Sequence, residues 1–328
     1  MTRTLVAAGL AILAAAAPAP AQRTMPDSRA SPAAEAPAAP RPKVMPRAFP
    51  TPEAGFAALA GAVRAQDVQR MVRILGEDAR RLIGSGDPVA DRMARERFAA
   101  AYASRHEILR PAPDRAELQV GEDKWPLPIP MVRRGGAWRF DPAAGAQELN
   151  DRRVGRNELD AIGTLRAIAD AQEEYARTAG RQGAFRTYAR HFLSSPGAHD
   201  GLYWPSTEGE PESPLGPLLA AASVGGYAAR RPRAGDAPQP YHGYHYRILE
   251  GQGPAAPGGA MDYVVDGRMI GGFAVIAWPA RYGVSGIKTF LISHHGTVWE
   301  RDLGPGTTGS ASGITRFDPG EGWTRVPD

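Results

Sequence analysis

The chain has 328 residues, a formal net charge of +4 and no cysteine. Without cysteine it cannot form a disulfide framework, use thiolate chemistry or carry a lipid-modified cysteine. Its 39 basic residues are scattered along the chain instead of forming a stripe, so we do not expect a surface that binds nucleic acid.

Residues 1–21 have the pattern of a secretory signal peptide. Arg3 precedes an apolar run over 5–17, and Ala19-Pro20-Ala21 supplies the small residues that signal peptidase requires. The apolar run is shorter than the roughly 20 residues that cross a bilayer. We therefore expect export to the periplasm or beyond, cleavage near Ala21, and no transmembrane segment in the mature chain.

Residues 22–50 are rich in proline and alanine and offer almost nothing large to bury. A segment of this composition gains too little from burial to offset the entropy of ordering, which predicts a disordered linker. The rest of the chain is long enough for two domains, which we expect at 51–150 and 151–328.

The domain at 51–150 is predicted to begin with helices and end with strands. Thr51-Pro52-Glu53 has the sequence of a helix N-terminus, and further helices are expected from Asp67 and from Asp87-Pro88. Short strands follow, and Gly135-Gly136 predicts a hairpin turn. Helices followed by a curved antiparallel sheet resemble a nuclear-transport-factor-like domain.

The domain at 151–328 is predicted to begin with a long helix, roughly 156–178, that has one apolar face. Strands are expected at 244–249, 263–265, 273–277, 289–292 and 297–301. A long helix packed on an antiparallel sheet is the outline of a pilin-like domain, and residues 162–176 are similar to pseudopilin sequences. The apolar half-helix that builds pilin filaments is missing, so this similarity implies shape and not assembly. The predicted fold class is α+β, with long ordered loops in the second domain.

Several stretches of the chain are rich in glycine, proline and aromatic residues: DGLYWP (200–205), SPLGPL (213–218), YHGYHYRIL (241–249), APGGA (256–260) and GGFAVIAWPARYG (271–283). Together with NDRRVGRNELDAI (150–162), they resemble an exported bacterial family known as domain of unknown function 2950. The resemblance covers roughly residues 50–328. It implies export, but no activity, substrate or catalytic residue.

Aromatic side chains in these stretches are candidate ligand-binding residues: Tyr203, Trp204, Tyr241, Tyr244 and Trp278. Aromatic rings flanked by polar groups can stack on sugar rings or peptide side chains. The expected partner is then an envelope protein or a glycan. The alternative is that these rings fill a core beneath loops, and the sequence leaves both interpretations open.

No catalytic motif is recognisable, so a non-catalytic interaction module of the cell envelope is the first hypothesis. The alternative is an envelope hydrolase acting on glycan or ester, with a site between the loop at 200–217 and the strand at 240–246. Its candidate acid–base residues are Asp200, His242 and His245. Because His242 and His245 would point to opposite faces of a strand, and no metal-binding motif is present, we expect no metal and no cofactor.

Overall fold

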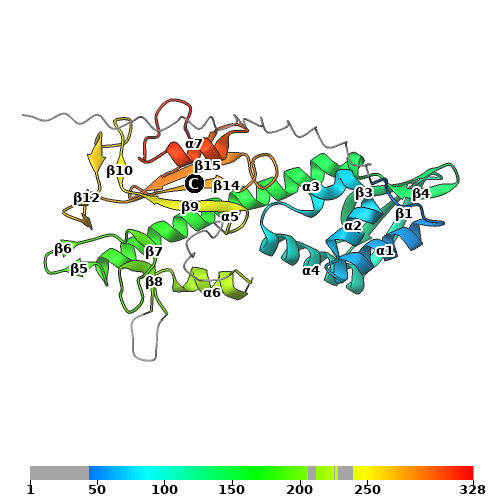
Figure 1. Ribbon diagram of the computed structural model, residues 1–328, viewed down its shortest axis with the longest axis horizontal. Helices are drawn as coiled ribbons and strands as arrows, with labels where there is room; N and C mark the ends of the chain where they lie inside the picture. Colours follow the sequence, from blue (N-terminus) through cyan, green and yellow to red (C-terminus); the bar gives the residue numbers. More distant parts are fainter. Residues whose placement is uncertain (1–43, 206–211, 225, 228–238, 328) are drawn as a thin grey trace, which may run out of the picture. The chain divides into compact units, whose positions relative to one another are not determined.

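A computed structural model describes residues 44–327 except 206–211, 225 and 228–238 (Figure 1). The described residues belong to one compact unit, Lys43–Asp328. The predicted signal peptide and most of the predicted linker lie outside the described residues. So does part of the loop at 200–217. Within the described part of the chain, no helix is both long and apolar enough to cross a membrane.

The first helices begin where the sequence predicts. Thr51, Asp67 and Asp87 each accept hydrogen bonds from backbone amides of the following turn, because a short polar side chain can satisfy the free N–H groups of a helix start. The three predicted helices are α1 (Pro52–Arg64), α2 (Val68–Leu75) and α4 (Pro88–Ser104). Between α2 and α4 lie two short elements that were not predicted, the 3₁₀ turn η1 (Glu77–Ala79) and α3 (Arg80–Ile83).

A four-stranded antiparallel sheet follows in the order β1-β2-β3-β4. Its strands are β1 (His106–Ala112), β2 (Arg115–Val120), β3 (Trp125–Arg134) and β4 (Ala137–Phe140). The predicted hairpin at Gly135-Gly136 is confirmed, since both glycines have positive φ and Arg134 pairs with Ala137. The chain is ordered before Thr51, because Phe49 is buried and pairs with Trp138. The last residues of the predicted linker are thus part of the fold.

The long helix is longer than predicted. A 3₁₀ turn, η2 (Pro142–Gly145), leads directly into α5 (Ala146–Arg177), which therefore starts about three turns before residue 156. Leu149 near its start packs against the core of the first helices and sheet, whereas Leu165 and Ile168 belong to a second core. One helix thus contributes to both cores and runs through the predicted boundary at 150/151. The division into two domains stays a prediction.

The second sheet is antiparallel, with the order β17-β16-β15-β14-β9. Its strands are β9 (Tyr244–Leu249), β14 (Ala274–Pro279), β15 (Lys288–Ser293), β16 (Val298–Asp302) and β17 (Thr324–Arg325). Four of the five predicted strands are therefore confirmed here. The fifth, at 263–265, contributes to a separate small hairpin.

The remaining elements are short. They are the helices α6 (Gly216–Val224) and α7 (Thr307–Gly313) and the strand pairs β5 (Arg181–Gln182) with β6 (Phe185–Arg186), β7 (His191–Leu193) with β8 (Gly201–Tyr203), β10 (Gly251–Gln252) with β11 (Met261–Asp262), and β12 (Val264–Val265) with β13 (Arg268–Met269).

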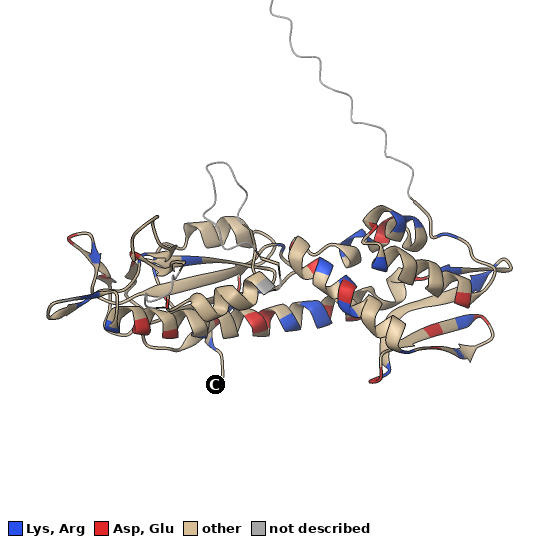
Figure 2. Ribbon diagram, turned by 90° about the horizontal axis from the view of Figure 1, so that it is seen from below, with Lys and Arg blue, Asp and Glu red and all other residues tan. Residues whose placement is uncertain are grey.

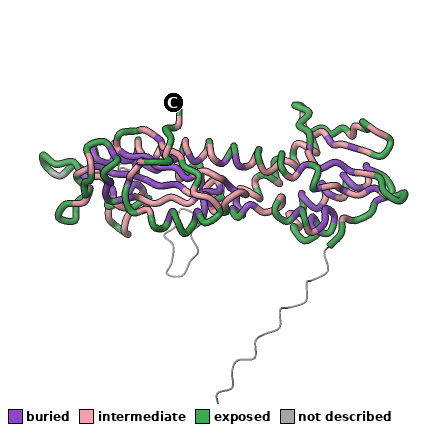
Figure 3. Tube along the Cα trace, turned by 90° about the horizontal axis from the view of Figure 1, so that it is seen from above, coloured by how far each residue is buried: buried purple, intermediate pink, exposed green. Residues whose placement is uncertain are grey.

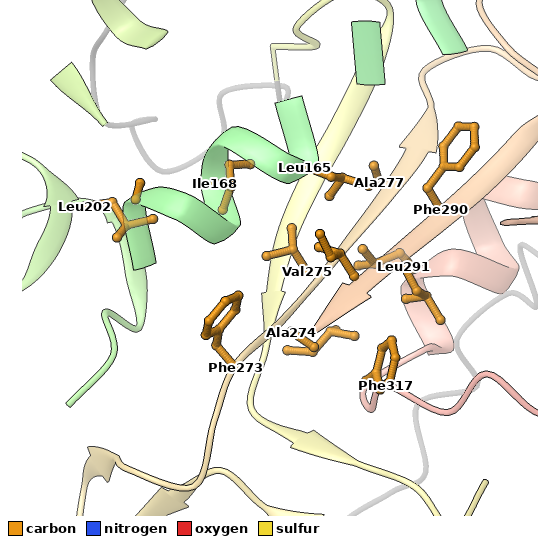
Figure 4. Close-up of a cluster of buried hydrophobic side chains, with 14 of the residues drawn as sticks. Leu165, Ile168, Leu202, Phe273, Ala274, Val275, Ala277, Phe290, Leu291 and Phe317 are labelled. Carbon is orange, nitrogen blue, oxygen red and sulfur yellow. The ribbon is translucent and has the colours of Figure 1, made fainter. Parts of the chain in front are cut away.

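Most buried residues gather at the two sheets (Figure 3), and Val89, Ala222 and Tyr227 form a third, smaller cluster. In the second core, Leu165 and Ile168 of α5 lie beside Val275 and Ala277 of β14 (Figure 4). Strand β14 is covered by α5 on one side and contacts α7 as well. A central strand with both faces covered is apolar without alternation, which explains the run AVIAWP. The α+β class is confirmed, and the likeness to pilins stays a prediction.

Candidate functional site

Two of the five candidate aromatic residues are buried in the second core. Tyr244 is fully buried, its hydroxyl donates a 3.0 Å hydrogen bond to the carbonyl of Lys288, and burial raises the pKa of the Tyr244 phenol. Trp204 is also buried and stacks on His199 with 4.3 Å between ring centroids. These two rings pack as core residues in the structure.

The other three candidates are half-buried and lie in separate surroundings. Tyr241 contacts Tyr227, with 4.9 Å between centroids. The guanidinium of Arg247 lies 5.7 Å from the ring centroid of Trp278. Tyr203 packs against the edge of the second core. Among the described residues, no ring contact joins Tyr203, Tyr241 and Trp278 into one platform. Ligand binding by these residues stays a prediction.

The three acid–base candidates also have separate partners. Asp200 accepts hydrogen bonds from the backbone amide and the hydroxyl of Ser195, at 2.6 and 2.7 Å. The hydrogen bond from the amide is the largest influence that lowers the pKa of the Asp200 carboxyl. His242 lies with Nδ1 3.3 Å from Oδ2 of Asp160. Burial lowers the pKa of the His245 imidazole. No hydrogen bond or ion pair in the described part of the chain joins Asp200 to either histidine.

A cavity of about 420 Å³ lies elsewhere, between the first helices, the start of α5 and the first sheet. Residues one helical turn apart on α1 and α2, and alternate residues on β3, turn apolar side chains into it. These are Leu59 and Val63, Met71 and Leu75, and Leu127 and Ile129. One face of each element therefore builds an apolar wall. No candidate residue from the sequence lies in this lining.

The cavity remains open because α4 presents small side chains to it. Ala94 and Ala101 line it at positions where larger residues would fill the space. Phe98, which lies between these alanines on α4, and Leu149 of α5 are only half-buried although they line the cavity. Alanines on the inner face of α4 are the sequence signal for this space.

The remaining lining is basic. Five arginines contribute to it, Arg95 and Arg97 from α4 and Arg152, Arg153 and Arg156 from α5. Spacings of three and four residues bring the α5 arginines to one side of that helix, together with Leu149. Figure 2 shows basic residues on the part of α5 that adjoins the first helices. Among the described lining residues, Asp91 is the only acid.

Backbone carbonyls and one carboxylate hold two of these arginines in place. Arg153 donates to the carbonyl of Arg81 at 3.0 Å and to that of Leu82, and burial lowers the pKa of the Arg153 guanidinium. Arg152 pairs with Glu148, and its guanidinium lies 5.4 Å from the ring centroid of Trp125. Carbonyl partners orient Arg153 without neutralising its charge.

Asp91 supplies one carboxyl group against the five guanidinium groups of the described lining. Its two carboxylate oxygens accept hydrogen bonds from the amide of Ser85 at 3.1 and 2.9 Å. Burial is the largest influence on the Asp91 carboxyl and raises its pKa, whereas the nearby guanidiniums of Arg153 and Arg95 act to lower it. Arg97 and Arg156 are exposed, and neither pairs with an acidic side chain that the structure describes. The cavity therefore has an apolar wall and a basic rim.

The N-terminus of α4 is fixed by the buried carboxylate of Asp87. Its Oδ1 accepts from the amides of Val89 and Ala90 at 3.1 and 3.0 Å. Its Oδ2 accepts from the hydroxyl of Tyr227 and the amide of Gly243, both at 2.8 Å. The helix that lines the cavity is thus bonded to the loop that carries His242.

Within the described residues, no group of three or more histidines and carboxylates is placed to hold a metal ion. The protein-family model described as "Protein of unknown function (DUF2950)" matches residues 46–326, which confirms the resemblance seen in the sequence. No curated protein and no solved structure matches the chain.

Proposed function

The chain belongs to the DUF2950 family, and we propose that it is a non-catalytic binding protein of the cell envelope whose cavity holds the apolar part of a small molecule. The observation that carries this proposal is the cavity of about 420 Å³ behind α4. Its volume falls within the roughly 300–1,000 Å³ of small-molecule sites. Side chains of this cavity are reachable from solvent, since Trp125 on its lining is exposed.

The composition of the wall favours an apolar molecule over a glycan. Leu59, Met71, Leu127 and Ile129 offer no hydrogen bond to a sugar hydroxyl. Burying a hydroxyl without a partner costs about 1–3 kcal/mol. A glycan or an envelope protein remains a proposed partner only for the half-buried aromatic residues.

The predicted signal peptide supports an envelope location. Arg3 and the apolar run after it are typical of exported proteins. We therefore place the binding protein in the periplasm or outside the cell. Periplasmic fractionation of the full chain, with loss of export when Leu10 is replaced by arginine, tests this part of the proposal.

Fluorescence titration with the neutral probe N-phenylnaphthylamine tests binding. The purified protein is expected to bind it saturably at a single site. Ala94→Phe extends a ring into the cavity and is expected to weaken binding at least about tenfold, since the ring displaces the probe. Ala100→Phe is the matched control, because Ala100 is also exposed on α4 but does not line the cavity. Equal binding by the two variants, or no saturable binding at all, would refute the proposal.

A further inference from the structure

We infer that the occupant of this cavity is a single-chain amphiphile with an anionic head group, bound with its tail against the apolar wall and its head at the arginines of α4 and α5. This inference rests on the proposed function and adds the chemical class of the ligand. It concerns a fatty carboxylate or an alkyl phosphate, which present the same charge to the same residues.

The two sides of the cavity differ in chemistry. Helices α1 and α2 and strand β3 supply apolar side chains such as Leu59, Met71 and Leu127. Every arginine of the lining comes from α4 or α5. A ligand that matches both sides must carry an apolar part and a charged part. A wholly apolar ligand would leave Arg97 and Arg156 without an anionic partner, and a small anion would leave the apolar wall exposed to water.

The sign of the head group follows from the charges at the rim. Five guanidiniums and one carboxyl group, that of Asp91, line the cavity, and of the five only Arg152 pairs with a described acid outside the lining, Glu148. Arg97 and Arg156 have no acidic partner among the described residues. Guanidinium groups bind carboxylates and phosphates through paired, charge-assisted hydrogen bonds. The rim therefore favours an anion and opposes a cation.

The engaged arginines contribute as well. Arg153 is held by two backbone carbonyls, so it stays in a fixed position at the cavity. A positioned, partly desolvated charge attracts an anion more strongly than a mobile exposed one, because less side-chain entropy is lost on binding. Arg152, which pairs with Glu148, contributes less.

Displacement of N-phenylnaphthylamine by ligands with one tail and different heads tests the inference. We expect laurate or lauryl phosphate to displace the probe, and lauryl alcohol to bind about tenfold more weakly, a difference of about 1.4 kcal/mol. Dodecyltrimethylammonium is expected to bind more weakly still. The two acids distinguish a carboxylate from a phosphate head, and tight binding of either supports the inference.

The arginine variants supply the second arm of the test. Arg97→Gln combined with Arg156→Gln is expected to weaken laurate binding about three- to tenfold and to leave the affinity for lauryl alcohol unchanged. Arg166→Gln is the matched control, since Arg166 is exposed on α5 outside the cavity lining. All variants retain the neutral-probe titration as a check on folding.

The outcomes separate the two proposals. If lauryl alcohol binds as tightly as both acids, or if the double variant behaves as the control, the ligand class is wrong while the apolar binding cavity stands. If the neutral probe does not bind saturably, the binding function itself is wrong. If the ammonium compound binds most tightly, the assignment of an anionic head is overturned.

Discussion

The phenol of Tyr227 donates a 2.8 Å hydrogen bond to the buried carboxylate of Asp87, which lies 140 positions earlier in the chain. The same carboxylate oxygen accepts from the amide of Gly243, and the other oxygen caps α4. Desolvation and the neighbouring carboxylate raise the pKa of the Tyr227 phenol, so the hydroxyl keeps its proton and remains a donor. One side chain therefore couples the helix at the cavity to the loop before β9.

Replacing Asp87 by alanine is expected to destabilise the protein by about 3 kcal/mol or more. The change removes a helix cap and leaves two buried donors, Tyr227 and Gly243, without a partner. Asp67→Ala removes a cap with only a local hydrogen bond and should cost about 1 kcal/mol. Urea unfolding measures both. Equal losses would contradict the long-range role of Asp87.

Tyr227→Phe removes the hydroxyl and keeps the ring. We expect a loss of about 1–2 kcal/mol, because Asp87 then retains one fewer donor in a buried site. Tyr203→Phe is the control, since the Tyr203 hydroxyl has no hydrogen bond to a described residue. Urea unfolding measures the difference in unfolding free energy, provided that the dependence of this free energy on urea concentration is the same for both proteins. An unchanged free energy of unfolding in Tyr227→Phe would show that the hydrogen bond contributes nothing to stability.

Gly243→Ala is expected to destabilise more than the same change at Gly283. Both glycines have positive φ, 75° and 70°, so the backbone cost is similar. A Cβ at Gly243 would lie 2.5 Å from Nδ2 of Asn157, whereas nothing lies within 4 Å of one at Gly283. Thermal unfolding should show a midpoint several degrees lower for Gly243→Ala. Equal midpoints would mean that Asn157 and its neighbours move aside for the added Cβ at no cost in stability.

Stability is expected to decrease on acidification through the titration of His245. Burial lowers the pKa of His245 below its ordinary 6.5 in the folded state, so the unfolded chain binds more protons between these two values. The free energy of unfolding therefore falls as pH decreases through about 6.5 and levels off below the folded pKa. The slope is less than about 1.4 kcal/mol per pH unit, because solvent screens a half-buried ring.

His245→Gln removes this titration and should flatten the dependence of unfolding free energy on pH between about pH 7.5 and about pH 5.5. His294, whose pKa is also lowered by burial, continues to contribute in this variant. Urea unfolding at both pH values gives the measurement. An unchanged slope would show that His245 does not drive the acid sensitivity.

The sequence pattern predicted where α1, α2 and α4 begin, but not which further groups their cap residues bind. Thr51, Asp67 and Asp87 were identified as caps because the pattern depends on the following four residues. The hydrogen bond from Tyr227 to Asp87 depends on the tertiary fold, so no spacing in the sequence indicates it. For the same reason, the sequence alone left open that Trp204 and Tyr244 are buried.

The cavity was not predicted, because its lining consists of ordinary helix and strand residues that form no recognisable motif. The predicted helix starts at about residue 156, whereas the first turns of α5 carry Arg152 and Arg153 in place of an apolar stripe on the side that lines the cavity. That exception to amphipathic patterning is itself the indication of a site, together with Ala94 and Ala101 on α4. Other sequences can be searched for this pattern, in which one helix carries arginines on its inward face and a second helix carries alanines on the facing side.

A crystal structure of the protein with a fatty acid brominated at the end of its tail tests the central claim most directly. We predict an anomalous bromine peak between α1 and β3, beside Leu59 and Leu127, with the carboxylate at Arg153 or Arg156. A peak beside Tyr203 or Trp278, or a cavity that stays empty at saturating ligand, would contradict it.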